Sequence, residues 1–272
     1  MTHDLHDDLR RIWKMSLVLA AGMLLSMSDE ARAASTFDFE SPTYASGSIN
    51  GQDSWTSSQT DERVLTSTEI SAELTAAGLN PATPVHGGDQ ALLLSGPGGS
   101  SSAATIHSIS GLSTANTAVL DFWARPLTSG SDGSAIGPNT GNVFIMMEDE
   151  QGSSGRATGV RFGPTSIDGY STNWVASSVS WQPDTWYNVQ LVANYLTKEF
   201  NLSVDGSLVL SGIPFHAADS PGLNQIRVFR GGSQAGMILD DVSVVPEPAT
   251  GLLLILSAGA FGLSVVRHRR SR

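Results

Sequence analysis

Short apolar runs recur through the middle of this 272-residue chain, separated by clusters of glycine, serine, asparagine, aspartate and proline. Runs of this kind, in which apolar and polar residues alternate, are typical of β-strands. They return at intervals of roughly 8–15 residues, and no long helical periodicity lies between them. This pattern excludes a parallel sheet built from strand–helix–strand units and predicts an all-β fold in which two antiparallel sheets pack face to face.

Roughly twelve strands are expected, and two of them show the alternation most clearly. Residues 118–125 place Leu120 and Phe122 on one face and Trp123 on the other, and residues 186–194 alternate in the same way. The other expected elements are strands over residues 36–40, 90–95, 103–109, 142–147, 159–162, 166–171, 174–178, 199–204, 207–210, 225–230 and 237–245, and one short helix over residues 70–79.

The dipeptide Asp205-Gly206 lies between two alternating runs. A type I′ turn needs positive φ at both central positions, and Asp-Gly is among the pairs that best tolerate this. Residues 199–210 are therefore expected to form a β-hairpin.

The first 33 residues have the order of a secretory signal peptide. Arg10, Arg11 and Lys14 precede a short apolar run from Met15 to Met27, and Ala31-Arg32-Ala33 provides a cleavage site. We expect residues 1–33 to form a signal helix that the Sec machinery recognises and that is removed after Ala33. The alternative is an anchor that remains uncleaved.

The last residues contain three parts in a fixed order. Pro246-Glu247-Pro248 is followed by 18 uncharged, mostly apolar residues, 249–266. A run of this length can span a bilayer as a helix. The basic residues after it would stay in the cytoplasm by the positive-inside rule, so residues 34–245 would lie outside. The basic end consists of Arg267, Arg269, Arg270 and Arg272.

This tail, residues 246–272, resembles the PEP-CTERM sorting signal of Gram-negative bacteria. The resemblance rests on the tripeptide, the apolar span and the arginine cluster at the extreme C-terminus. It implies an exosortase as partner, with the tripeptide as its recognition element. It also implies a membrane-anchored stage with the main domain outside, and a cell-surface or extracellular form after processing. The alternative is a plain C-terminal anchor behind a proline-rich stalk.

The charge of the chain excludes some classes of partner, and its lack of cysteine excludes disulfides as a source of stability. Between Ala34 and Pro248 the chain has seven Lys and Arg against 21 Asp and Glu, a formal charge of 7 − 21 = −14. A surface that negative repels nucleic acid and anionic lipid. With no cysteine in the chain, stability must come from burial, hydrogen bonds or a bound metal, without disulfides.

A second resemblance covers most of residues 37–245. The run W-Q-P-D-T-W-Y-N-V from Trp181, together with the later V-D-G ending at Gly206, is similar to the laminin-G and concanavalin-A-like jelly-roll sandwich. L-D-F-W-A-R (120–125) and I-L-D-D-V-S-V (238–244) resemble other strands of that fold. The resemblance implies the fold, but this architecture carries lectins, adhesion modules, glycosidases and spacers, so function needs a site.

Glu40, Asp240 and Asp241 are the candidate metal ligands. The closing strand also resembles the last strand of jelly-roll carbohydrate-binding modules. In those modules the first and last strands are neighbours, and carboxylates there hold a structural calcium ion. Calcium takes six to eight oxygen ligands. Alternation in the last strand places Asp240 on the same face as Ile238 and Val242, pointing inward. The alternative is an Asp240 that accepts backbone N–H bonds, with the other two carboxylates solvated.

Trp55, Tyr170 and Trp174 are the candidate carbohydrate-binding residues. Aromatic rings stack on the apolar faces of sugars, and the last two residues are close in sequence. The alternative for each tryptophan is core packing, because a large sandwich needs such rings. Trp123 and Trp186 are assigned to the core or its edges.

A polysaccharide-cleaving enzyme on the same fold would need a pair of carboxylate side chains that point toward one site. Glu148, Asp149 and Glu150 are contiguous, so neighbouring side chains point to opposite faces, and the glycine and serine residues that follow suggest a solvated hairpin tip. No zinc, phosphate-binding or nucleophile motif is visible. The first hypothesis is therefore a non-enzymatic surface or matrix protein that binds extracellular polysaccharide. The alternatives are a polysaccharide hydrolase or lyase, and a structural spacer without ligand.

Overall fold

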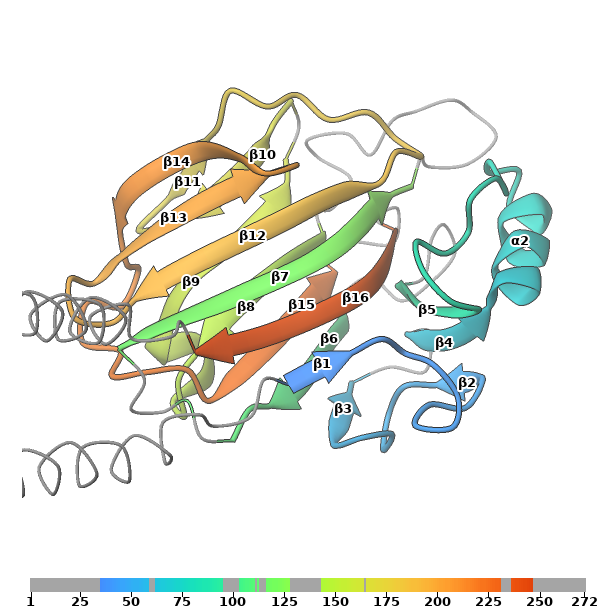
Figure 1. Ribbon diagram of the computed structural model, residues 1–272, viewed down its shortest axis with the longest axis horizontal. Coiled ribbons are helices and arrows are strands. Elements are labelled where there is room, and N and C mark those ends of the chain that lie inside the picture. Colours follow the sequence, from blue (N-terminus) through green and yellow to red (C-terminus); the bar gives the residue numbers. More distant parts are fainter. Residues whose placement is uncertain are drawn as a thin grey trace, which may run out of the picture. The chain divides into compact units, whose positions relative to one another are not determined.

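The computed structural model describes residues 35–58, 62–94, 103–110, 112, 116–127, 143–163, 165–230 and 236–246 of the chain. These residues form sixteen strands, one α-helix and one short 3-10 helix. The strands assemble into two antiparallel sheets that lie one behind the other (Figure 1). The expected all-β sandwich is therefore confirmed.

The first sheet has nine strands in the order β14-β13-β12-β7-β16-β5-β4-β2, and β1 also pairs with β16. The second sheet has seven strands in the order β11-β10-β9-β8-β15-β6-β3. The strand bounds are β1 (Ser35–Phe37), β2 (Gly47–Ser48), β3 (Trp55–Ser57), β4 (Arg63–Thr66), β5 (Gln90–Leu94), β6 (Ala103–Ser108), β7 (Thr117–Pro126), β8 (Val143–Glu148), β9 (Arg156–Phe162), β10 (Ile167–Tyr170), β11 (Trp174–Ala176), β12 (Tyr187–Asn194), β13 (Glu199–Val204), β14 (Ser207–Pro214), β15 (Gln225–Arg230) and β16 (Met237–Pro246).

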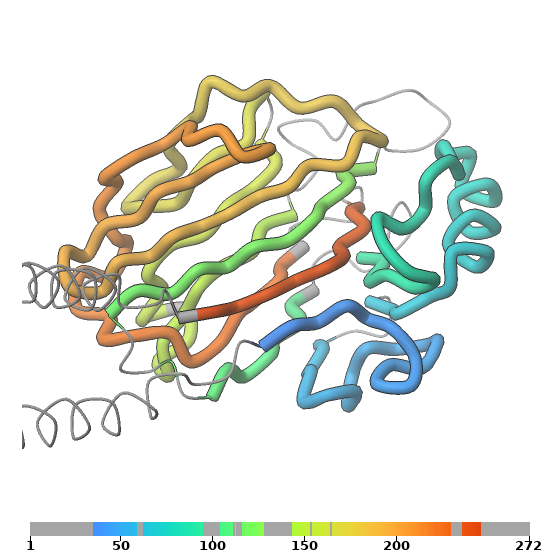
Figure 2. The backbone as a smooth tube through the Cα atoms, in the orientation of Figure 1, coloured from blue at the N-terminus to red at the C-terminus, as the bar shows by residue number. Residues whose placement is uncertain are grey.

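The first and last described strands are neighbours, as expected from the resemblance. β1 runs antiparallel to the second half of β16, with Phe37 opposite Val242 (Figure 2). The first half of β16 pairs instead with β5, through Met237 to Leu239. A short gap between β5 and β1 therefore opens beside the middle of β16.

The core lies between the two sheets and follows the alternation in the sequence. On β7, Leu120 and Phe122 are fully buried, and on β12 Val189 and Leu191 are fully buried. These residues face each other in register across the β7–β12 ladder, Leu120 opposite Leu191 and Phe122 opposite Val189. Burial of a large apolar side chain stabilises the fold by about 1.5–3 kcal/mol.

The hairpin expected at Asp205-Gly206 is confirmed. β13 and β14 pair through Val204 and Ser207. Asp205 has φ 49° and Gly206 has φ 74°. Positive φ at both central positions is the backbone that a type I′ turn requires.

The chain between Phe39 and Gln90 differs most from expectation, because β2, β3 and β4 were not foreseen. The helix α2 runs over Ser67–Ala76, three residues earlier than the expected 70–79. It begins there because Thr66 and Glu69 form a capping box, in which each side chain accepts a hydrogen bond from the backbone N–H of the other residue. The buried side chains of α2, Ile70 and Leu74, belong to a second, smaller apolar cluster.

Several expectations fall outside the described residues. These are the signal peptide 1–33, the apolar span 249–266, the basic tail 267–272, and Glu247 and Pro248 of the tripeptide. Within the described part of the chain, no helix has both the length and the apolar composition needed to span a bilayer.

Candidate functional site

The outer surface of the seven-stranded sheet combines arginines with aromatic rings. It is formed by outward side chains of β8, β9, β10, β11 and β15, which are consecutive in that sheet. Inward residues of the same strands, such as Ile145 and Val228, belong to the core. We call this surface the arginine–aromatic face; it consists of Phe144, Glu148, Arg156, Arg161, Asp168, Tyr170, Trp174, Gln225, Arg227 and Phe229.

Glu148 is the centre of the polar part of this face. Its carboxylate is completely buried and accepts hydrogen bonds from both neighbouring strands. Arg156 donates from Nε and Nη2 over 3.2 and 2.9 Å. Arg227 donates from Nε over 2.8 Å, and Gln225 from Nε2 over 2.7 Å. One buried carboxylate therefore orients two guanidinium groups.

A second ion pair lies beside the first. Arg161 donates from Nε to Oδ2 of Asp168 over 2.9 Å, and Ser166 donates to the other carboxylate oxygen over 2.5 Å. The guanidinium carbon of Arg161 lies 4.4 Å from the ring centroid of Trp174. This is a cation–π geometry. The side chain of Asp168 is only 4% exposed, so Arg161 is held in place from below.

Tyr170 and Trp174 are brought together, as their proximity in sequence suggested. They are directly opposite in the β10–β11 hairpin, and their ring centroids are 4.8 Å apart. Trp174 also contacts Phe144, and Phe144 stacks on Phe229 with centroids 4.6 Å apart. Half-buried rings thus form a continuous row from β15 to β10.

His216 extends this row. Its ring centroid is 4.9 Å from that of Tyr170. Its Nδ1 lies 3.1 Å from the carbonyl oxygen of Ser171. Because a carbonyl only accepts, Nδ1 donates this hydrogen bond.

Trp55 is not part of this surface. It is completely buried in the core, where it contacts Phe37 and Phe39. Its indole N–H donates to the hydroxyl of Tyr44 over 3.2 Å. The expectation that Trp55 forms a sugar platform was wrong, because β3 points this side chain between the sheets.

Glu148 and Asp149 were also misjudged. The sequence suggested a solvated hairpin tip, but their exposed fractions are 0% and 1%, and only Glu150 is exposed. Glu148 is the last residue of β8 and follows the alternation of Phe144 and Met146 on the outer side of the strand. Continuing the strand by one residue would have placed it on the arginine–aromatic face.

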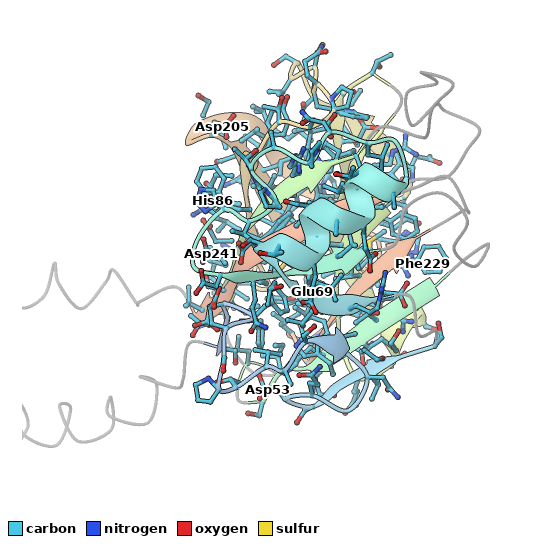
Figure 3. All side chains as sticks on the ribbon, turned by 90° about the vertical axis from the view of Figure 1, so that its right-hand side faces the viewer. Asp53, Glu69, His86, Asp205, Phe229 and Asp241 are labelled. Atoms are coloured by element: carbon cyan, nitrogen blue, oxygen red, sulfur yellow. The ribbon has the colours of Figure 1, made fainter. Side chains whose placement is uncertain are left out.

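The three candidate metal ligands each contact residues 86–90, on the opposite side of the sandwich. Figure 3 shows His86 and Asp241 together on one side and Phe229 on the other. Oδ2 of Asp240 accepts from the backbone N–H groups of His86 and Gly87 over 2.9 and 3.2 Å. Oε1 of Glu40 accepts from Asp89 and Gln90 over 2.7 and 2.8 Å.

Asp240 does not share a face with Val242, contrary to expectation. Asp241 has φ 49°, and the register with β7 shifts between Asp240 and Ser243. This β-bulge reverses the alternation, so Leu239 and Val242 point into the main core whereas Ile238 belongs to the smaller cluster on the other side. Asp240 is buried beneath the 86–90 segment.

Burial raises the pKa of Asp240 to about 6, although the N–H groups of Gly87 and His86 oppose the shift. Asp241 lies nearby and its Oδ2 is 2.8 Å from Nδ1 of His86. Among the described residues, no group of three or more histidine, aspartate or glutamate side chains is arranged to hold a metal ion. The carboxylates of Glu40 and Asp240 instead fix the backbone of residues 86–90.

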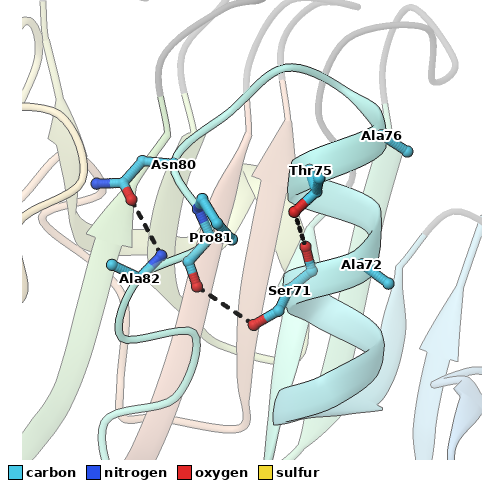
Figure 4. Close-up of a pocket in the computed structure, with 7 residues that line it drawn as sticks. All are labelled: Ser71, Ala72, Thr75, Ala76, Asn80, Pro81 and Ala82. Carbon is cyan, nitrogen blue, oxygen red and sulfur yellow. Dashed lines mark hydrogen bonds between the residues drawn. The ribbon is translucent and has the colours of Figure 1, made fainter.

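A pocket lies beside α2 in the described part of the chain (Figure 4). Its wall is stabilised by hydrogen bonds from Ser71 Oγ to the carbonyl of Pro81, over 3.2 Å, and from Thr75 Oγ1 to the carbonyl of Ser71, over 2.7 Å. It has no charged or aromatic lining side chain, and therefore offers no chemistry comparable to the arginine–aromatic face. The lining residues are Ser71, Ala72, Thr75, Ala76, Asn80, Pro81 and Ala82.

Several solved structures are similar to this chain, and the first of the three described here supports its fold. A sialidase superposes with a TM-score of 0.52 at 14% identity, over 80% of this chain but only 19% of the sialidase. Lectin II from Ulex europaeus gives a TM-score of 0.45 at 10% identity, over 79% of this chain and 98% of the lectin. The carbohydrate recognition domain of Emp46p gives 0.41 at 11% identity, over 71% and 88%. At such identities the likeness concerns the fold alone.

No curated protein sequence matches the chain. A family model described as the PEP-CTERM protein-sorting motif matches residues 244–270. The match begins within β16, whose last residue, Pro246, is the first residue of the tripeptide. The chain therefore carries a PEP-CTERM protein-sorting motif directly after its β-sandwich, and solved structures similar to that sandwich include lectin-type domains.

Proposed function

We propose that this is an exported, non-enzymatic protein that binds extracellular carbohydrate through the arginine–aromatic face. In this proposal the Sec machinery exports the chain and the C-terminal helix holds it in the membrane. An exosortase then recognises Pro246-Glu247-Pro248 and processes the tail. The sandwich remains at the cell surface or outside the cell. The sorting motif matched at residues 244–270 supports the export route.

The row of rings on the seven-stranded sheet is the observation that carries the binding role. Tyr170, Trp174, Phe144 and Phe229 are all half-buried, so each ring keeps surface available for contact. Single exposed apolar side chains are normal, whereas a contiguous row of partly exposed rings is typical of an interaction site. Polar donors lie directly beside them, from Arg161 and Arg156. Rings for stacking next to groups for hydrogen bonding are what a sugar-binding surface needs.

The acids on this face favour binding over hydrolysis. Glu148 accepts hydrogen bonds from Arg156, Arg227 and Gln225, and Asp168 accepts from Arg161 and Ser166. A glycosidase needs one carboxylic acid that donates a proton and a second carboxylate that is free to attack or to activate water. Both carboxylates here are engaged by arginines and therefore have a positioning role.

The test is a glycan array probed with the full chain in detergent, using matched tryptophan variants. Trp174→Ala removes a ring from the centre of the row and should abolish most of the signal. Trp186→Ala removes a half-buried indole that packs against the smaller apolar cluster and should leave the signal unchanged. Equal binding by both variants would contradict the proposal. Release of shortened or unsaturated sugars by the wild type would show an enzyme instead.

A further inference from the structure

The charge of the arginine–aromatic face differs from that of the domain around it. The chain has seven basic against 21 acidic residues between Ala34 and Pro248. Arg156 and Arg161 on β9 and Arg227 on β15 nevertheless lie on the two strands that flank β8 in one sheet. With Glu148 and Asp168 included, the face has a formal charge of 3 − 2 = +1. An excess of positive charge in an acidic domain needs a reason.

The two carboxylates are buried, whereas the three arginine side chains are partly exposed. The exposed fractions are 0% for Glu148 and 4% for Asp168, against 17%, 18% and 20% for Arg156, Arg161 and Arg227. Buried acids therefore anchor the cations from below. Arg227 and Arg161 each use Nε for this ion pair, and a guanidinium has five N–H donors in a fixed plane. The side chains of Arg156, Arg161 and Arg227 therefore remain partly accessible to solvent.

Two of the three cations also lie next to a ring. Arg161 covers the indole of Trp174, and Arg156 lies 5.6 Å from the ring centroid of Tyr170. A ligand in contact with this face therefore meets an aromatic surface and a planar cation side by side. A uronic acid residue presents the complementary pair, because it has a ring with apolar C–H faces and a carboxylate attached to that ring. Guanidinium groups bind carboxylates bidentately, which fixes the orientation of the ligand.

We propose that the ligand of the arginine–aromatic face is a carboxylated polysaccharide, one that contains uronic acid residues. The inference rests on the proposed carbohydrate-binding function and adds the chemical class of the sugar. The carboxylates of the domain outside this face do not prevent such binding. At physiological ionic strength charges are screened beyond about 8 Å, so arginines in direct contact with the ligand outweigh distant acids.

The experiment compares two polymers with the same backbone, using the full chain in detergent. Polygalacturonate carries one carboxylate per residue, and its carboxyl-reduced form carries none. One charge-assisted contact is worth about tenfold in affinity or more. We therefore expect polygalacturonate to bind at least about tenfold more tightly, and added salt to weaken only this binding.

A matched pair of arginine variants tests the mechanism without removing a charge. Arg161→Lys keeps a cation beside buried Asp168 but loses the planar fork and the stacking on Trp174. It should lower the affinity for polygalacturonate severalfold and the affinity for the reduced polymer by a clearly smaller factor. Arg63→Lys makes the same change in an ion pair with Glu73 between β4 and α2, and should affect neither polymer. Melting temperatures of both variants verify that they fold.

The outcomes separate this inference from the proposal beneath it. Equal binding of both polymers would leave carbohydrate binding intact and overturn the uronate assignment. Binding of neither polymer, with an empty glycan array, would overturn both. Single-stranded DNA that binds as tightly as polygalacturonate would show that the face responds to negative charge alone, and would also overturn the inference.

Discussion

The guanidinium of Arg161 lies over the indole of Trp174, 4.4 Å from the ring centroid. The same guanidinium is tied to the nearly buried carboxylate of Asp168. The three residues come from β9, β11 and β10, which are consecutive along the chain and adjacent in the sheet. Local strand pairing therefore positions the exposed cation and the ring before any ligand arrives, and preorganisation of this kind lowers the cost of binding.

The ion pairs of Glu148 are expected to support stability as well as geometry. Glu148→Gln would leave Arg156 and Arg227 without the carboxylate that neutralises them, because Glu148 is completely buried. Breaking a buried pair by removing one partner costs about 3–5 kcal/mol. Urea denaturation should show this loss in the free energy of unfolding.

Glu150→Gln provides the control for this prediction. Glu150 lies two residues further along and is exposed, so its substitution should change stability by less than about 0.5 kcal/mol. If both variants unfold at the same urea concentration as the wild type, then Glu148 is not the anchor of the two arginines.

Strands β7 and β12 could be predicted because their burial follows a two-residue period. On β12, and on β7 as far as Ala124, every second side chain is buried between the sheets, which is what alternation encodes. The β13–β14 hairpin was predictable from Asp205-Gly206 because few dipeptides accept two positive φ values. Within the candidate sugar site, Tyr170 and Trp174 could be predicted from the sequence, because they are close together in it and a hairpin joins their strands.

Other features could not be predicted because they depend on tertiary contacts. The bulge at Asp241 reverses the face of β16 at a residue that is not glycine, and alternation carries no signal for it. β2 has two residues, too few to show a period. Arg227 reaches the arginine–aromatic face from β15, which is far along the chain from Glu148 but pairs with β8. The capping box at Thr66 and Glu69, by contrast, was visible in the sequence and was overlooked.

The sorting motif leads to a prediction about the mature mass. Replacing Pro246-Glu247-Pro248 by three alanines should leave export intact, because the N-terminal segment is unchanged, but should stop processing of the tail in the native host. Pro246 ends β16 opposite Ala118, so the substitution leaves the sandwich pairing in place. Mass spectrometry of the wild type and the variant gives the answer. Mature masses that differ by no more than the three substitutions would refute exosortase recognition of this tripeptide.

Calcium binding by Glu40, Asp240 and Asp241 remains a prediction, and it can be tested by melting curves. An ion that binds only the folded chain stabilises it by about 2.7 kcal/mol at 100 times its Kd, a rise of several degrees in melting temperature for a domain of this size. Asp240→Asn should remove the rise. Glu150→Gln is the control, because Glu150 is an exposed carboxylate outside the candidate calcium site. A melting temperature indifferent to calcium and chelator would leave the carboxylates as acceptors of the 86–90 backbone alone.

Asp240 should also make stability depend on pH. Its pKa is raised from 3.8 to about 6 by burial, so the folded chain holds this proton more tightly than the unfolded chain. Stability is therefore lost as pH rises from about 4 to about 6, by about 3 kcal/mol. Asp240→Asn removes this titration. The free energy of unfolding of the wild type, relative to the variant, should fall across that window, whereas a constant difference would contradict the raised pKa.

Gly88 is expected to be the residue of the 86–90 segment least tolerant of substitution. It has φ +58°, and a Cβ added there would lie 2.1 Å from Oε1 of Glu40. Gly88→Ala therefore adds left-handed strain of roughly 1–2 kcal/mol. It also displaces the carboxylate that accepts from Asp89 and Gln90, at a further cost of about 1–3 kcal/mol. Gly206→Ala is the matched control, because Gly206 has φ +74° with nothing within 4 Å of an added Cβ, so it carries the strain alone. The difference between the two free energies of unfolding measures how strongly Glu40 holds residues 86–90. Equal losses in the two variants would mean that Glu40 contributes nothing to that segment.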